Sequence, residues 1–348
     1  MKNWPILSSP FVHSDNSVRK TMMQVQLASF PALFVYFYFF GYGITIQWTL
    51  GVMTALLVEG LMLYLRNRPI KPYITDFSAL ITVTGLAFSV PPDAPWWVMV
   101  TGISFALIFG KHLYGGLGYN PFNPAMLGFA FLIISFPVQM TLWTSPIDVS
   151  GEKPSFLQSL EIIFLGQSQG ITIDQITGAT PLGHIKTQLT QGIPLSETLK
   201  ENLFTHFQTG VGWVWVNIAF IMGGLYLLLT RTIRWQFPVG FLAGLGIMAF
   251  IFHQIDPETY APLSVHLLSG GTMLAAFFII TDPVTAPTTP RGRLFFAFSI
   301  GVLLYIIRNW GAFPDGIAFA ILILNMFVPL IDQYTQPRVF GYNVENKS

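Results

Sequence analysis

One polar stretch, "DQITGATPLGH" from Asp174 to His184, stands out in a chain otherwise built of long apolar segments. It contains an acidic residue, two spacers and then Thr-Gly-Ala-Thr. From average residue usage, a match to Asp-x-x-Ser/Thr-Gly-Ala-Thr occurs by chance in roughly one chain in a thousand of this length. The pattern is therefore specific, and the groups it offers for chemistry are the hydroxyls of Thr177 and Thr180.

The motif resembles the substrate motif of flavin transferases, in which the last threonine receives FMN through a phosphoester. The resemblance implies attachment at Thr180, with Asp174, Thr177, Gly178 and Ala179 in the other motif positions. Because an external enzyme must reach the hydroxyl, we expect an accessible, extended segment and not a helix. The two small residues keep the approach open. Asp174 and Thr177 are expected to serve recognition by the transferase and not catalysis.

Two cationic candidates follow the motif, His184 and Lys186. A phosphodiester anion would be stabilised by loop N–H groups and by such side chains. The alternative, which we favour for both residues, is ordinary solvated loop polarity.

The composition excludes an ordinary soluble enzyme. Of 348 residues, 52% are hydrophobic and 9% charged, against about 25% charged in soluble domains. The net charge of +1 gives no basic field for nucleic acid. The absence of cysteine excludes thiolate-ligated iron–sulfur clusters, Cys-type zinc sites and disulfides.

The N-terminus lacks the features of a secretory signal and is expected to remain on the mature protein.

Apolar runs predict about ten transmembrane helices, since a helix needs about 20 apolar residues to cross the hydrocarbon core. Several runs are short or interrupted by Gly and Pro. The alternation typical of a membrane β-barrel is missing. The candidate spans start near Met23, Thr45, Ile74, Trp96, Pro124, Val211, Phe237, Val265, Leu294 and Ile317.

Lys and Arg are distributed unevenly over the connections between these spans. With the N-terminus inside, thirteen of the 17 fall on the cytoplasmic side, which favours this orientation. Both termini are then cytoplasmic and the Thr180 loop lies on the periplasmic side. The thirteen are Lys2, Arg19, Lys20, Arg66, Arg68, Lys71, Lys111, Arg231, Arg234, Arg291, Arg293, Arg338 and Lys347; the other four are Lys153, Lys186, Lys200 and Arg308.

The two halves of the chain resemble each other. "SVPPDAP" and "GYNPFNPAMLGFAFLI" in the first half have counterparts "IITDPVTAP" and "GAFPDGIAFAILIL" in the second. Five spans per half would insert the second half upside down, giving two inverted five-helix repeats. The alternative, equally supported, is that Gly and Pro only mark tight turns. We divide the chain into a first membrane repeat (1–143), a periplasmic loop region carrying the motif (144–207) and a second repeat (208–348).

Segments along nearly the whole chain resemble the RnfD/NqrB family, which includes the D subunit of the bacterial Rnf ion-translocating oxidoreductase complex. They are "KHLYGGLGYNPFNPAM", "DQITGATPL", "HLLSGGTMLAAFFIITDPVTAPTTPRGR", "GAFPDGIAFA" and "PLIDQYTQPRVFGY". The resemblance implies a urea-transporter-like fold, an inner-membrane location and covalent FMN on the outer side. It also implies partners: NADH or ferredoxin modules, iron–sulfur subunits and a second FMN-bearing subunit. A free riboflavin, found in the sodium-pumping relative, is neither confirmed nor excluded.

Several acidic residues lie within or beside the spans. Glu59 must face protein or water, because an ionised carboxylate in lipid costs about 2.5–3.5 kcal/mol on insertion scales. An ion or proton relay and a carboxylate bonded to a neighbouring helix remain equal alternatives. Asp76 is expected at the membrane interface near Lys71, and Asp282 is expected to cap a broken helix.

Glycines and asparagines predict irregular backbone at two places. Asn120 and Asn123, with the preceding glycines 115, 116 and 118, indicate an unwound segment, and "SGGT" at 269–272 is its expected counterpart. The histidines 112, 253 and 266 show no metal-ligand spacing.

Two functions fit these observations. The first is an electron-carrying subunit with FMN on Thr180, coupled to Na⁺ or H⁺ movement and not catalytic alone, because the chain lacks a GxGxxG unit for NADH. The second is a transporter or channel for a small polar solute, which an inverted repeat would equally support.

Overall fold

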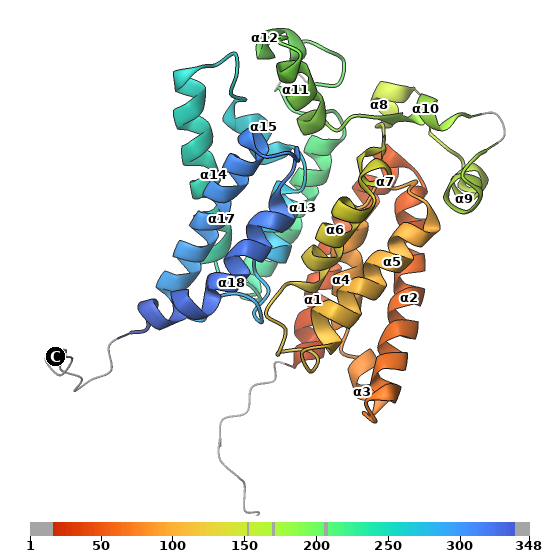
Figure 1. Ribbon diagram of the computed structural model, residues 1–348, viewed down its shortest axis with the longest axis vertical. Coiled ribbons are helices and arrows are strands. Elements are labelled where there is room, and N and C mark those ends of the chain that lie inside the picture. The colour runs from red at the N-terminus through yellow and green to blue at the C-terminus, as the bar shows by residue number, and fades with distance from the viewer. Residues whose placement is uncertain (1–16, 152, 169–170, 205–207, 338–348) are drawn as a thin grey trace, which may run out of the picture.

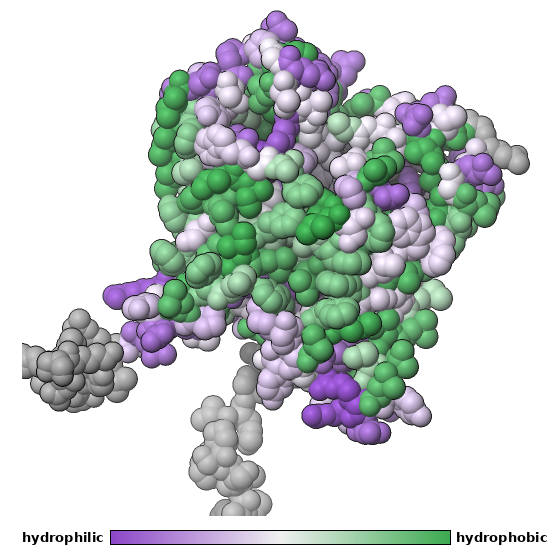
Figure 2. Space-filling model, viewed as in Figure 1, coloured by the Kyte–Doolittle hydropathy of each residue, from purple (hydrophilic) through white to green (hydrophobic). Residues whose placement is uncertain are grey.

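The structure, a computed structural model, describes residues 17–151, 153–168, 171–204 and 208–337 and consists mainly of helices (Figure 1). Among the described residues, five helices are long and apolar enough to cross a membrane. They are α1 (Val18–Phe40), α2 (Gly43–Leu65), α14 (Gln236–Ile255), α17 (Pro290–Trp310) and α18 (Ile317–Thr335). Apolar residues cover the middle of the visible face, with polar residues towards both ends (Figure 2). The predicted class, an all-α polytopic membrane protein, is confirmed.

The other five expected spans are shorter or broken helices. Two of them contain a π-helical turn, η1 or η2, and one is interrupted in its middle. They are α4 (Ser78–Ala87), α5 with η1 (Trp96–Leu107, Ile108–His112), α6 (Pro124–Ser135), α13 (Trp213–Leu229), and α15 with α16 and η2 (Leu263–Leu268, Thr272–Leu274, Ala275–Ile279).

The helices form two groups that follow each other in the chain. The first contains α1, α2, α4, α5 and α6, and the second contains α13, α14, α15 to η2, α17 and α18. Helices α1 and α13 pack side by side and run in opposite directions (Figure 1). The two groups therefore begin at opposite ends of the bundle, as the predicted inverted repeat requires.

The segment between the two groups lies at one end of the bundle, called here the loop end (Figure 1). It contains a two-stranded sheet and short helices. These are β1 (Trp143–Thr144), α8 (Ile147–Ser150), α9 (Phe156–Leu165), α10 (Ile173–Ile176), β2 (Thr177–Gly178), α11 (Pro181–Thr190) and α12 (Leu195–Thr198). Helix α7 (Pro137–Thr141) precedes it, and α3 (Ile70–Ile74) lies at the opposite end. Three of the thirteen residues used for orientation, Lys2, Arg338 and Lys347, lie outside the described residues.

Aromatic side chains join the two groups. Tyr36 and Phe40 of α1 contact Trp213 of α13, with ring centroids 6.2 and 5.0 Å apart. Phe88, directly after α4, lies 4.9 Å from Phe220 of α13. Such edge-on pairs contribute about 0.5–1.5 kcal/mol each beyond the burial of their area. They hold the two groups at a fixed separation beneath the Thr180 segment.

Candidate functional site

The motif segment is held by a short antiparallel pairing. Thr177 and Gly178 form β2, which pairs with Trp143 and Thr144 of β1. A Cβ atom on Gly178 would lie 2.7 Å from the Ser145 hydroxyl oxygen, so this position has no room for a side chain. From Thr177 to Thr180 the backbone is extended, as expected.

Asp174 departs from that expectation, because it lies in the one-turn helix α10 and not in extended chain. The helix begins with a capping box between Thr172 and Gln175. A carboxylate in the first turn is favoured by the helix dipole, which explains the local fold. The Asp174 side chain is exposed and therefore accessible to an external protein.

Thr180 is the N-cap of α11. Its φ and ψ are −65° and 155°, and its Oγ1 accepts a hydrogen bond from the Gly183 N–H at 3.2 Å. Pro181 occupies the first helical position, where its missing N–H is no loss. A Cβ on Gly183 would lie 3.1 Å from Thr180 Oγ1, so glycine leaves space around the hydroxyl. The N-terminus of a helix is a favourable place for an anion, because its N–H groups and dipole point at it.

The two cationic candidates have partners within the protein. The His184 Nε2 lies 2.8 Å from a carboxylate oxygen of Glu201. The Lys186 ammonium donates to the main-chain carbonyls of Arg308, Gly311 and Phe313, at the C-terminal end of α17. Burial lowers the pKa of Lys186. Neither side chain is simply solvated, and Lys186 attaches α11 to the second group of helices.

A cavity of about 610 Å³ opens beside Thr180 at the loop end. Ala179, Thr180 and Lys186 line it on the side of the motif. Both groups of helices and the segment between them supply the rest of the lining, which is mainly apolar and includes seven aromatic residues. The aromatic lining residues are Tyr36, Phe88, Phe129, Trp143, Trp213, Phe220 and Phe313. Its volume falls within the roughly 300–1,000 Å³ typical of small-molecule sites.

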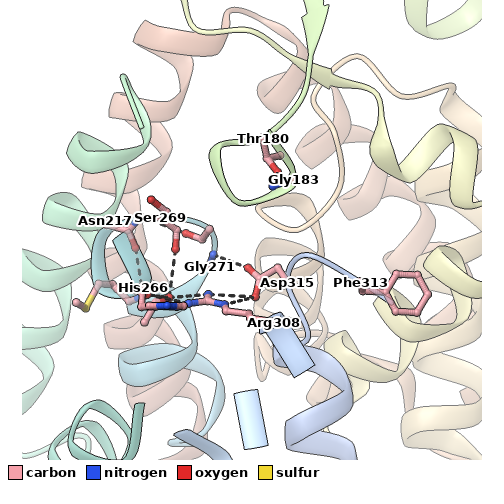
Figure 3. Close-up of polar contacts among 12 residues, drawn as sticks. Thr180, Gly183, Asn217, His266, Ser269, Gly271, Arg308, Phe313 and Asp315 are labelled. Carbon is pink, nitrogen blue, oxygen red and sulfur yellow. Dashed lines mark hydrogen bonds and ion pairs between the residues drawn. The ribbon is translucent and has the colours of Figure 1, made fainter. Parts of the chain in front are cut away.

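The break between α15 and α16 also lines this cavity and lies below Thr180 and Gly183 in the view of Figure 3. Gly270 has a φ of +62°, and the Gly271 N–H donates to Asp315 Oδ2 at 3.1 Å. The same carboxylate accepts from Arg308 at 3.1 Å. Arg308 also donates to the His266 carbonyl of α15 and to Thr272 Oγ1 of α16, each at 2.8 Å, so it joins both sides of the break.

The side chain of Asn217 in α13 forms hydrogen bonds with main-chain groups on both sides of the break between α15 and α16. Its amide nitrogen donates to the carbonyls of Leu268 and Gly270, each at 3.1 Å, and its amide oxygen accepts from Met273 N–H at 3.2 Å. Neither Asn217 nor Arg308 was predicted as part of a site. An Asn within the apolar run "VWVNIAF" and an Arg within a long apolar helix were the signals that could have indicated them.

Asp93 ties the motif to the first group of helices. It lies in the loop between α4 and α5, and its Oδ2 accepts from the Thr144 hydroxyl at 2.8 Å, directly beside the pairing of Thr144 with Thr177. Burial raises the pKa of Asp93 to about 6, an increase that the Thr144 hydrogen bond partly offsets.

A second cavity, of about 270 Å³, opens at the opposite end of the bundle. It is more polar, and Leu117, Asn120 and Asn123 of the expected unwound segment line it. Glycines 115, 116 and 118 of that segment have positive φ. The Asn123 amide donates to Asp282 Oδ2 at 3.4 Å, which joins the two groups of helices. Phe88, Leu274 and Ile279 line both cavities, so apolar side chains separate them.

Comparison with known proteins assigns the family. The model of the NQR2, RnfD, RnfE family matches residues 6–341. The chain belongs to this family. It is similar to the D subunit of the ion-translocating oxidoreductase complex from Yersinia enterocolitica (serotype O:8 / biotype 1B), with 49% identity over 350 residues, 98% of this chain and 99% of the relative. The proteins of the same name from Vibrio cholerae (O395) and Cronobacter sakazakii are 49% and 48% identical over 345 residues, 97% of this chain and 99% of each relative.

In this member of the family, Glu59 forms a buried ion pair with Lys111 of η1. Lys111 also donates to the Ser78 hydroxyl at 2.8 Å. Glu59 is therefore bonded to a neighbouring helix, as one of the two alternatives predicted. A role of this carboxylate in proton or ion movement stays a hypothesis. Lys111 was counted among the loop cations, and the structure buries it to 3% exposure.

The remaining polar positions of this family member have local roles. Asp76 Oδ1 accepts from the backbone N–H and the hydroxyl of Ser78, so it caps the start of α4. Asp282 accepts from Val284 N–H and the Thr285 hydroxyl, which caps the turn after η2 and not the start of a helix. Among the residues the structure describes, no cluster of His, Asp and Glu could hold a metal ion.

Proposed function

We propose that this chain is the integral membrane subunit of an ion-translocating oxidoreductase complex, with FMN attached to Thr180 through a phosphoester. The observation that carries the proposal is the position of the Thr180 hydroxyl, at the N-terminus of α11 and on the edge of the loop-end cavity. The names of the similar subunits support the placement in such a complex.

The local geometry fits each part of FMN. The phosphate would lie at the N-terminus of α11, where backbone N–H groups and the helix dipole favour an anion. Gly183 leaves space for the substituent on the hydroxyl. The flavin ring would find a cavity of sufficient volume, lined by aromatic and apolar groups of both halves of the bundle. FMN, when bound, supplies electron transfer in one-electron or two-electron steps.

The chain's own residues position this group. Thr180 contributes the ester oxygen, β1 and β2 fix the segment before it, and Lys186 fixes the helix after it to α17. Asp174 and Thr177, with Gly178 and Ala179, would be recognised by a flavin transferase. We place the loop end on the periplasmic side of a bacterial inner membrane, because the connections at the other end carry most of the Lys and Arg.

Two buried polar atoms in the opposite cavity are the reason to include a second, non-covalent flavin such as riboflavin in the proposal; the volume of this cavity, about 270 Å³, lies just below the range typical of small-molecule sites. The Gln26 Nε2 and the Asn120 Oδ1 are buried and have no hydrogen-bond partner among the described residues. Both residues line this cavity. A buried donor and a buried acceptor cost free energy when unpaired, and a flavin ring offers both complementary groups.

Coupling to Na⁺ or H⁺ movement is the remaining part of the proposal. Cavities at both ends, separated by Phe88, Leu274 and Ile279, would allow access from either side with a closed centre. The partners would be iron–sulfur and NADH or ferredoxin modules and a second FMN-bearing subunit. The same cavities would also suit a small polar solute, so the covalent flavin is what separates electron transfer from a transporter.

The test is flavin attachment at position 180. The protein, produced with a flavin transferase and FAD and then denatured, should fluoresce under ultraviolet light, and Thr180→Ala should not. Thr180→Ser keeps a hydroxyl and a helix cap and serves as the matched control for folding. Mass spectrometry of the 171–204 region should place the adduct on Thr180. A dark wild-type band would favour the transporter, and fluorescence of Thr180→Ala would move the attachment to another residue.

A further inference from the structure

Helix α9, in the loop-end segment, is capped at both ends. Ser155 and Gln158 form a capping box at its start, and Gly166 ends it with a φ of +75°. Residues of the helix itself and its two flanking residues therefore cap both ends. At 10 residues, it spans about 15 Å.

The helix has large apolar side chains on two opposite faces. One face packs on the protein and buries Ser159, Ile162 and Ile163. The other exposes large apolar side chains, with Leu157 at 69% and Phe164 at 46% exposure. These two are seven residues apart, which places them on the same side of a helix. Glu161, which lies on the exposed side between Leu157 and Phe164, is only partly exposed and accepts from the Ser168 hydroxyl at 2.7 Å.

The exposed face continues the apolar surface of the spanning helices. Phe156 contacts Tyr42, between α1 and α2, with ring centroids 5.6 Å apart. Lys153 Nζ lies 5.7 Å from the ring of Tyr38, an α1 residue that is 59% exposed. Figure 1 shows α9 beside the loop end of α2, set apart from the rest of the bundle.

We propose that α9 is an interfacial helix that inserts its Leu157–Phe164 face into the adjacent membrane leaflet. The occupant of this face is the boundary between lipid head groups and acyl chains. Since the exposed apolar surface of α1 must itself face lipid, a neighbouring helix at the end of α1 and α2 meets the same leaflet. Lys153, at the start of this region, is suitably placed for lipid phosphates. The anchor would hold the first part of the 144–207 segment against the membrane.

The absence of cysteine makes a site-specific test simple. Single cysteines at Leu157, Phe164 and Gln167, each carrying a nitroxide, would be compared in the full chain reconstituted in liposomes. Labels at Leu157 and Phe164 should be relaxed more by oxygen than by a water-soluble nickel chelate, and the exposed Gln167 should show the reverse order. Equal access of the nickel chelate to all three would overturn the proposal.

A protein partner on this face is the other outcome to be tested. A photo-crosslinking benzoylphenylalanine at Leu157 in the assembled complex should form lipid adducts and no adduct with another subunit. A protein adduct would overturn the lipid assignment. Flavin attachment at Thr180 is independent of either result, so its success or failure would be scored separately.

Discussion

At the scale of single residues, the Thr180 hydroxyl has two roles that compete for the same oxygen. It caps α11 by accepting from Gly183 N–H, and it is the proposed ester oxygen. An ester oxygen is a weaker acceptor than a hydroxyl, but the attached phosphate brings further oxygens to the same helix N-terminus. The modification would therefore replace one cap with another and leave α11 in place.

Gly183→Ala tests whether space around that hydroxyl matters. The new Cβ would lie 3.1 Å from Thr180 Oγ1, and a phosphate there is bulkier than the hydroxyl. We expect the fraction of flavin-bearing protein to fall well below that of wild type, measured as fluorescence per denatured chain. Gly60→Ala, in α2, is the matched control and should incorporate flavin normally, because its Cβ would come no closer than 3.9 Å to Ile74. Full incorporation in Gly183→Ala would show that the site tolerates the side chain.

The buried Glu59–Lys111 pair gives a prediction about stability. Lys111→Met would leave the Glu59 carboxylate without its cation, which typically costs about 3–5 kcal/mol. The double variant Glu59→Gln/Lys111→Met removes both charges and should be less destabilised than Lys111→Met alone. Thermal unfolding in detergent would measure both.

The double variant also separates the two roles of the carboxylate, because it lacks Glu59 and leaves no buried charge of the pair without its partner. If the double variant folds stably but abolishes ion-coupled electron transfer in the complex, the pair acts in ion movement. A double variant whose loss of stability equals the sum of the losses in Glu59→Gln and Lys111→Met would instead show that the pair contributes no net coupling.

At the scale of elements, the sequence predicted what depends on local composition. The long helices follow from apolar runs, and the interruption at 269–271 follows from two adjacent glycines. Partners distant in sequence were not predictable in this way. Lys111 and Arg308 were assigned to loops because a charge suggests water, whereas Glu59 and Asp315 allow them to be buried. The one-turn helix around Asp174 depends on a capping box too short to produce a periodic signal.

The break between α15 and α16 can be tested with two neighbouring glycines. Gly270 has a φ of +62°, and a Cβ there would lie 2.4 Å from Asp315 Oδ2. Gly270→Ala should therefore destabilise the protein by about 1–3 kcal/mol or more. Gly271 has a φ of −90°, and a Cβ added at this position would lie 3.4 Å from Ile317 Cδ1, which is an ordinary contact.

Gly271→Ala is accordingly the matched control and should cost less than Gly270→Ala in thermal unfolding. The flavin content of both variants should be measured as well, because the break lines the loop-end cavity. Equal unfolding temperatures for the two variants would contradict the assigned backbone geometry.

At the scale of the whole molecule, the two halves use related polar contacts at opposite ends. Lys111, at the end of the α5–η1 helix, donates to Ser78, the first residue of α4. Arg308, near the end of α17, donates to Thr272, the first residue of α16. In each half a buried cation from the fourth span therefore contacts a hydroxyl at the start of a short helix that belongs to the third span. An inverted repeat places one such contact near each end of the bundle, next to one cavity.

This arrangement makes the orientation of the chain decisive for function, because it determines which cavity faces the cytoplasm. Gln167→Cys, at the loop end, and Gln333→Cys, in the last turn of α18, are exposed, uncharged positions in a chain without other cysteines. In intact spheroplasts a membrane-impermeant maleimide should label Gln167→Cys, and Gln333→Cys should react only after permeabilisation. The basic residues near α18 would be retained on the cytoplasmic side by the positive-inside preference. The reverse labelling pattern would place Thr180 in the cytoplasm and would contradict the periplasmic position proposed for the flavin.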